Sequence, residues 1–309
     1  MKRALPLDQM FFLAGSTGCG KTSLALELAK HCQGEIVNSD AFQVYQGMNT
    51  LVAMPGLEDQ SQAPHHLFGI IPPEKEFDVA QYTERAKTVI EDIISRKRLP
   101  IITGGSGLYI KALTHGLSPT PPGDEALRAE CARLSLDDLV KWLHLVDPEA
   151  VATINLKNRR YVTRALEITL LSGSPSSSLK NEWQTNPEPI FHGVVLFRQR
   201  DDLYQRINQR TVEMFDQGVV DEVKNIGQCS TTAGKAIGLR EIRKLIDGQQ
   251  SEADTISSIQ QATRHFAKRQ QTWFRREKGF QTVCVEASEQ ANSVVRNIMS
   301  AFPELGPTS

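Results

Sequence analysis

The sequence lacks a marked excess of charge of either sign. Its 309 residues include 35 lysines and arginines and 36 aspartates and glutamates, which leaves a formal net charge of −1. This balance excludes a protein that coats nucleic acid by bulk electrostatic attraction, although it leaves room for a local basic surface. Hydrophobic residues make up 40% and charged residues 23% of the chain, as in ordinary globular proteins, so a disordered chain is also excluded.

Cysteines and long apolar runs are scarce as well. No CxxC pair indicates a zinc knuckle or a disulfide framework, and this spacing favours a reducing compartment. The cysteines are Cys19, Cys32, Cys131, Cys229 and Cys284. No segment approaches the roughly 18 consecutive apolar residues of a membrane span, and the first residues lead into a short apolar strand rather than a signal peptide. We therefore expect a cytoplasmic protein without a membrane partner.

Short apolar runs alternate with helical patterns in the first third of the chain. The runs at residues 10–14, 35–40 and 99–103 have the composition of buried strands, whereas residues 23–32 and 82–96 carry apolar side chains at helical spacing. Strands separated by helices are typical of a parallel sheet with crossover helices. The sequence therefore predicts an α/β fold with a parallel-sheet core.

A block of purely helical pattern interrupts this alternation, and clusters of proline and glycine flank it. Its helical patterns cover residues 124–134, 136–146 and 158–171. Strand-like composition returns at residues 193–197 and 282–285. We therefore predict an all-helical domain, residues 119–189, inserted into a core that consists of residues 1–118 and 190–309.

A glycine-rich motif joins the first predicted strand to the first predicted helix. Its sequence GSTGCGKT matches the P-loop pattern G-x-x-x-x-G-K-[ST], in the strand–loop–helix context that the motif needs. Backbone amides of such a loop bind phosphate, Lys21 adds a positive charge, and Thr22 can ligate Mg²⁺. The predicted phosphate-binding residues are Gly15, Ser16, Thr17, Gly18, Cys19, Gly20, Lys21 and Thr22. The motif predicts a diphosphate or triphosphate ligand and Mg²⁺ as cofactor.

A carboxylate, Asp40, ends the second predicted strand. In an ordinary P-loop nucleotidase such a residue ligates the metal, but here Phe42, Gln43 and Tyr45 follow it, and such groups suit a flat heterocycle with hydrogen-bonding edges. A second glycine-rich turn brings Ser106 to the same sheet edge, where ligands of α/β proteins bind. The alternative is that Asp40 only caps a loop.

The sequence has two further notable features, a pair of histidines and a set of basic segments. The paired histidines His65 and His66 have no third ligand at metal spacing, so we expect them to be structural residues of a loop. Basic residues alternate with amides and aromatics at residues 235–240 and 264–276, a composition that contacts RNA phosphates and stacks on unpaired bases. The same helices also bury an apolar face, which leaves the other face open to RNA.

The ordered motifs resemble the tRNA dimethylallyltransferase (tRNA isopentenyltransferase) family of bacterial type over about residues 10 to 278. The phosphate loop, the segment 38–48 and the sequence GGSGLY at 104–109 match the family's phosphate loop, acceptor-base motif and GGTGLY motif. Two segments depart from the family: residues 49–55 read NTLVAMP in place of DIGTAKP, and Ala41-Phe42 replaces Ser-Arg.

The resemblance implies a reaction. The family transfers a dimethylallyl group from dimethylallyl diphosphate to N6 of adenosine 37, in tRNAs that read codons beginning with U, and releases diphosphate. It implies that Asp40 is the general base, that Ser106 forms a hydrogen bond near Asp40 and the acceptor base, and that Arg210 stabilises the leaving diphosphate. The partners are the tRNA anticodon loop and the prenyl donor, and we expect a monomer.

The resemblance also implies a set of tRNA-binding residues, in the core and in the inserted domain. They are Asp40, Ala41, Phe42, Gln43, Ser106, Arg128, Arg160, Arg164, Lys235, Arg240, Lys268 and Arg269.

Two alternatives remain. One is a P-loop small-molecule or nucleotide kinase, in which ATP fills the loop and Asp40 activates a hydroxyl group; the basic and aromatic C-terminal segment would then have no role. The other is a non-catalytic RNA-binding module, which the intact Lys21, Thr22 and Asp40 disfavour.

Overall fold

The chain divides into two compact units. The computed structural model describes residues 5–118, 120–179 and 190–305. Unit 1 consists of Met1–Thr114 and Pro189–Ser309, and unit 2 consists of His115–Glu188. The flanking residues 119 and 189 of the predicted insertion lie outside the described residues. Among the described residues, no helix is long and apolar enough to span a membrane, and all five cysteines are free thiols.

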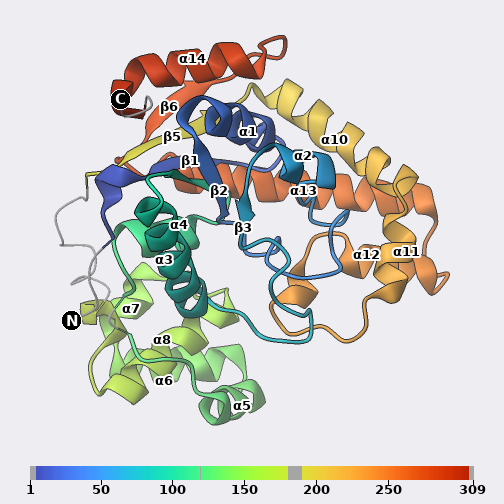
Figure 1. Ribbon diagram of the computed structural model, residues 1–309. Coiled ribbons are helices and arrows are strands. Elements are labelled where there is room, and N and C mark those ends of the chain that lie inside the picture. The colour runs from blue at the N-terminus through green and yellow to red at the C-terminus, as the bar shows by residue number, and fades with distance from the viewer. Residues whose placement is uncertain (1–4, 119, 180–189, 306–309) are drawn as a thin grey trace. The chain divides into compact units, whose positions relative to one another are not determined.

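Unit 1 is built on a parallel sheet of six strands in the order β3-β2-β4-β1-β5-β6 (Figure 1). The strands are β1 (Phe11–Gly15), β2 (Gly34–Asn38), β3 (His65–His66), β4 (Leu99–Gly104), β5 (His192–Phe197) and β6 (Gln281–Cys284). The predicted α/β fold with a parallel-sheet core is therefore confirmed. β1 is central, so the loop that follows it lies at the middle of the sheet's carboxyl edge.

Helices cover both faces of this sheet. Successive strand residues point to opposite faces, so Phe12 and Ile102 join one hydrophobic cluster while Phe11, Leu13 and Ile101 join another. The first cluster includes residues of α3 (Val79–Ser95), α4 (Gly107–Thr114) and α13 (Glu252–Phe274). The second includes residues of α1 (Lys21–Cys32) and α14 (Ala291–Ala301), which lie side by side in Figure 1.

Four further helices among the described residues of unit 1 follow β2 or β5 in the chain. They are α2 (Leu57–Gln62), α10 (Arg200–Asp216), α11 (Val219–Asn225) and α12 (Leu239–Ile246), with short 3₁₀ turns η1 (Leu7–Gln9), η2 (Ala233–Lys235) and η3 (Pro303–Leu305). α10 packs against α13 and α11, and α11 packs against α12. These contacts bring the C-terminal basic segments into the same unit as the sheet.

The paired histidines differ from the sequence prediction. They form the short edge strand β3 rather than a loop. His66 Nε2 lies 2.8 Å from Glu35 Oε2 on the neighbouring strand, and Arg96 also binds this buried carboxylate. The hydrogen bond from Arg96 lowers the pKa of Glu35, against the opposing effect of burial. The expectation of a structural role fits these contacts, because the histidine pairs with a core carboxylate.

The described part of unit 2 is helical. Its helices include α5 (Glu125–Arg133), α6 (Leu136–Val146), α7 (Pro148–Thr153) and α8 (Arg159–Ser172), and the described residues 176–179 are also helical. Leu139, Leu143 and Leu166 form the centre of its own hydrophobic core. The buried carboxylate of Glu167 holds two basic side chains within the unit: Arg128 Nε lies 2.9 Å from Oε1, and Arg164 Nη1 binds Oε2.

Candidate active site

The 15–22 loop, which is the predicted phosphate-binding segment, connects β1 to α1. Gly18 (φ +82°) and Gly20 (φ +97°) have left-handed backbone conformations that favour glycine. A Cβ on Gly18 would also stand only 3.0 Å from Ile207 Cγ1 of α10. The Lys21 ammonium group folds back over this loop and donates to the carbonyl oxygen of Ser16 at 2.9 Å. The loop therefore sets one cation and the N-terminus of α1 at the edge of the sheet.

Arginines of α10 bind the same loop from the opposite side. Arg206 Nε donates to the Gly18 carbonyl oxygen at 3.0 Å, and Arg210 Nη2 donates to Thr17 Oγ1 at 2.8 Å. Burial lowers the pKa of the Arg210 guanidinium, and the Asp40 carboxylate opposes that shift. Arg210 Nε is buried and has no hydrogen-bond partner among the described residues. A buried, unpaired donor beside the loop is suited to an anionic ligand.

Gln270 joins the 15–22 loop to the second glycine-rich turn. Its Oε1 accepts from Thr17 N at 2.8 Å, and its Nε2 donates to the Gly105 carbonyl oxygen at 3.0 Å. The sequence prediction missed this role. A signal existed, because Gln270 lies on the same helical face as the buried Ile259 and Phe274, where a polar side chain needs a hydrogen-bond partner.

Asp40 lies two residues beyond the end of β2, in a tightly bonded turn. Asp40 Oδ1 accepts from Phe42 N at 2.9 Å, and Asp40 N donates to Asn38 Oδ1 at 2.8 Å. Ser106 Oγ accepts from Ala41 N at 2.9 Å. The hydroxyl of Ser106 therefore holds the backbone next to Asp40 and retains its own proton for donation.

Glycine at position 104 allows the turn after β2 to approach the turn after β4. A Cβ on Gly104 would stand 2.1 Å from the carbonyl oxygen of Ser39, and Ser106 N donates to this same oxygen at 3.2 Å. Any side chain at position 104 would force the two turns apart. The glycine thus fixes the distance between the Asp40 turn and the Ser106 turn.

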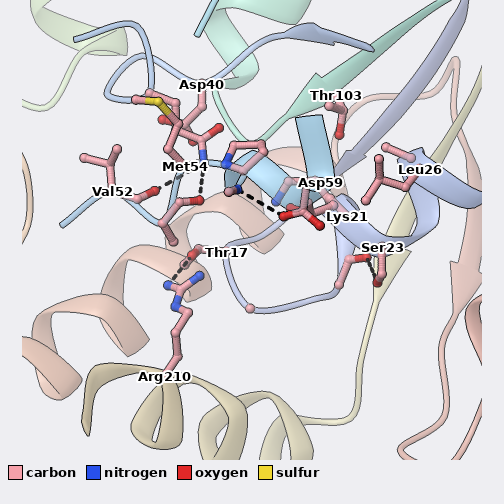
Figure 2. Close-up of a pocket in the computed structure, with 18 of the residues that line it drawn as sticks. Thr17, Lys21, Ser23, Leu26, Asp40, Val52, Met54, Asp59, Thr103 and Arg210 are labelled. Atoms are coloured by element: carbon pink, nitrogen blue, oxygen red, sulfur yellow. Dashed lines mark hydrogen bonds between the residues drawn. The ribbon is translucent and has the colours of Figure 1, made fainter. Parts of the chain in front are cut away.

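A pocket of about 1420 Å³ in unit 1 is lined both by residues of the 15–22 loop and by Asp40. Of the predicted site residues, those that line it are Thr17, Gly18, Gly20, Lys21, Thr22, Asp40, Gln43 and Arg210. Figure 2 shows Asp40 and Arg210 on different sides of the pocket, with Thr17 at the tip of the arginine. The Asp40 carboxylate and the predicted phosphate-binding loop therefore face the same pocket.

Several predicted residues support the pocket rather than line it. Ala41 and Phe42 pack against the hydrophobic core, and Cys19 is a fully buried side chain of the 15–22 loop. Gly15 and Ser16 are also absent from the wall, as is Ser106. Their assignment as binding residues stays a prediction, because they adjoin residues that do line the pocket.

Oxygen ligands in the pocket suit Mg²⁺ only together with a phosphate ligand. Among the described residues, no group of three or more His, Cys, Asp and Glu side chains could hold a metal. Mg²⁺ commonly takes one or two protein oxygens and completes its shell with water and substrate phosphates. Thr22 and Asp40 line the pocket, as does Thr103, whose buried hydroxyl has no hydrogen-bond partner among the described residues. This donor set fits the ion.

The predicted tRNA-binding residues fall into two groups. In unit 1, Lys235, Arg240, Lys268 and Arg269 are exposed on η2, α12 and α13. In unit 2, Arg160 and Arg128 are exposed, and Arg128 and the half-buried Arg164 also bind Glu167 as described above. The structure brings Asp40 and Gln43 together in the pocket, and it leaves the basic residues distributed over the surfaces of their own units.

Comparisons with known proteins give a consistent result. A family model described as IPP transferase matches residues 43–277. The tRNA dimethylallyltransferase of Akkermansia muciniphila is 42% identical over 295 residues, which cover 96% of this chain and 99% of that protein. Among solved structures, the tRNA isopentenylpyrophosphate transferase of Bacillus halodurans matches with a TM-score of 0.70 at 32% identity, over 96% of this chain and 97% of that one. A eukaryotic dimethylallyltransferase acting on tRNA has a TM-score of 0.81 at 24% identity, over 98% of this chain and 81% of that one, and so shares the fold.

Proposed function

Because the chain belongs to the IPP transferase family, we propose that it transfers the dimethylallyl group of dimethylallyl diphosphate to N6 of adenosine 37 in tRNAs that read codons beginning with U. The products are N6-isopentenyladenosine and diphosphate. The observation that carries the proposal is the single pocket in which Asp40 lies with the 15–22 loop and Arg210. That pocket offers a base to an acceptor and positive groups to a leaving diphosphate.

The diphosphate of the donor binds the 15–22 loop. Backbone amides and the N-terminus of α1 favour its negative charge, and Lys21 lies across the loop to meet it. Arg210 adds its unpaired Nε from the α10 side. Mg²⁺, held by Thr22 and the diphosphate itself, supplies further charge neutralisation when it is bound.

Asp40 acts on the acceptor. The N6 nitrogen attacks C1 of the dimethylallyl group, the new N–C bond forms, and the C–O bond breaks with its electron pair on the diphosphate. An aromatic amine is a weak nucleophile, so removal of its proton by the Asp40 carboxylate assists the attack. The turn bonds at Phe42 N and Asn38 Oδ1 fix the carboxylate in position.

The acceptor adenosine leaves the anticodon loop to enter the pocket, and this extrusion costs less in a loop than in a duplex. The exposed Lys235, Arg240, Lys268 and Arg269 of unit 1 and Arg160 of unit 2 contact tRNA phosphates. Arg128 and Arg164 contribute through the charge that Glu167 leaves uncompensated. The monomeric state and the cytoplasmic location stay predictions.

A transfer assay tests the function. Labelled dimethylallyl diphosphate and unmodified tRNA are incubated with the protein, and the tRNA is digested to nucleosides. We expect labelled N6-isopentenyladenosine. Absence of transfer, together with tight Mg²⁺-dependent ATP binding that dimethylallyl diphosphate does not displace, would instead support the kinase alternative.

A further inference from the structure

The loop formed by residues 49–54 departs from the family pattern, yet it forms part of the pocket wall. Asn49, Thr50, Val52, Ala53 and Met54 all line the pocket. Leu51 is the exception, because it is buried elsewhere, with 6% of its surface exposed. The backbone of residues 49–54 must be held by contacts with other segments if these side chains are to keep their positions in the wall.

Glu222 of α11 holds this backbone with both of its carboxylate oxygens. Oε2 accepts from Thr50 N and Oε1 accepts from Leu51 N, each at 2.8 Å. Bonds from backbone amides to an ionised carboxylate are stronger than neutral ones. Glu222 lies 171 residues beyond Leu51 in the chain, so these two bonds join distant segments.

Leu51 provides a second, apolar anchor, at the position where the family usually has glycine. Its Cδ1 lies 2.9 Å from the point where a Cβ on Gly238 would stand, and Ile259 borders the same space. Gly238 has φ +97° and is the N-cap of α12. The Leu51 side chain occupies the space that a side chain at position 238 would need.

Gln43 fixes the far end of the loop. Its Nε2 donates to the carbonyl oxygens of Val52 at 3.2 Å and Ala53 at 2.8 Å. With the two anchors above, the backbone is held on both sides of Val52. Figure 2 shows Val52 and Met54 on the same side of the pocket as Asp40. Both are apolar and stand where the family usually has threonine and lysine.

We propose that Glu222 is a positioning residue of the donor site: it fixes residues 50 and 51, so that Val52 and Met54 form an apolar wall against the dimethylallyl group. The inference rests on the proposed function, because it takes dimethylallyl diphosphate as the donor. In the proposed function the diphosphate binds the 15–22 loop, which is a different segment of the pocket wall from residues 52 and 54. Loss of the anchor therefore weakens binding of the prenyl group and spares binding of the diphosphate.

Calorimetry without tRNA separates these two parts of the ligand. Glu222→Gln keeps the side chain's shape but replaces one acceptor with an NH₂ group, so one of the two backbone bonds is lost. We expect dimethylallyl diphosphate to bind about 3- to 10-fold more weakly, and inorganic pyrophosphate to bind within about twofold of wild type. The matched control is Asp221→Asn, because Asp221 is an exposed neighbour that pairs with Lys224 at 2.9 Å; it should leave both affinities unchanged.

Hydrogen exchange gives a second readout, which needs no ligand. The amides of Thr50 and Leu51 should exchange on the order of tenfold faster in Glu222→Gln and at the wild-type rate in Asp221→Asn. If Glu222→Gln does not fold, Leu51→Gly removes the apolar anchor alone, and it should again weaken the prenyl donor selectively.

Equal weakening of both ligands, or unchanged exchange together with unchanged affinities, would overturn the positioning role. If the wild-type protein binds dimethylallyl diphosphate no more tightly than pyrophosphate, the proposed function is overturned. If the wild-type protein binds dimethylallyl diphosphate more tightly than pyrophosphate and Glu222→Gln does so to the same extent, only the role of Glu222 is overturned.

Discussion

Asp40 has two roles that substitutions can separate. Its Oδ1 accepts the Phe42 backbone amide at 2.9 Å, and its carboxylate is the proposed base. Asp40→Asn retains a side-chain oxygen for the turn but has no basic group. Because a positioned general base contributes about 10²- to 10⁴-fold, the rate should fall by that factor, or by about 3 to 5 kcal/mol in the barrier.

Asp40→Ala removes both roles. Its rate should fall by the same factor, and the lost turn bond should also lower the free energy of unfolding by about 1 kcal/mol. The difference between the two variants therefore lies in stability alone. Asp78→Asn is the matched control: Asp78 caps α3 by accepting from Ala80 N and Gln81 N and does not line the pocket, so the transfer rate should not change.

The assay is a single turnover with saturating donor and tRNA, quenched at intervals and analysed for modified nucleoside. Filter binding supplies the tRNA dissociation constant, which should remain within about twofold of wild type because phosphate contacts dominate affinity. Urea unfolding supplies stability. Asp40→Asn with more than a tenth of the wild-type rate would refute the base assignment, as would lost tRNA binding with an unchanged single-turnover rate.

Three further predictions concern the site and the core. Gly104→Ala should lower the free energy of unfolding by about 3 kcal/mol in urea, because its Cβ would meet a backbone oxygen at 2.1 Å; Gly227→Ala, with open space around it, should be neutral. Arg210→Lys should slow single-turnover transfer about 10- to 100-fold, since lysine lacks the planar fork, whereas the exposed Arg200→Lys should not. The hydrogen bond from the Arg96 guanidinium lowers the pKa of Glu35 in the folded protein. The ionised carboxylate therefore stabilises the fold fully above about pH 4.5, and this stabilisation is lost as the pH falls through the lowered pKa of Glu35. Urea titrations from pH 7 to pH 3 should accordingly show a shallower loss of stability for Glu35→Gln.

Features encoded in short stretches of sequence could be predicted. The glycine spacing of the 15–22 loop, the apolar run before it and the helical pattern after it are all contiguous, and the structure has β1, the loop and α1 in that order. Strand alternation likewise predicted the parallel sheet, because each crossover helix separates two buried runs. In each case the residues that determine the local structure are neighbours in the sequence.

Contacts between distant segments could not be predicted in this way. Glu222 stands in the first turn of α11 next to Asp221, and acidic residues are common there for helix-dipole reasons alone. Its partners lie near residue 50, so nothing in the local pattern distinguishes the half-buried Glu222 from its exposed neighbour. The Leu51 anchor has the same difficulty, because its space exists only through the backbone conformation of Gly238.

Net charge illustrates the same limit for the proposed RNA-binding residues. The net charge counts every arginine equally, whereas in the structure the arginines have different partners. Arg206 donates to a loop carbonyl oxygen and keeps its charge, whereas Arg164 is paired with the buried carboxylate of Glu167. Lys268 and Arg269 remain exposed on α13. Attraction to a polyanion depends on where the exposed charges lie and not on their sum, so a chain of net charge −1 can still present a local basic surface.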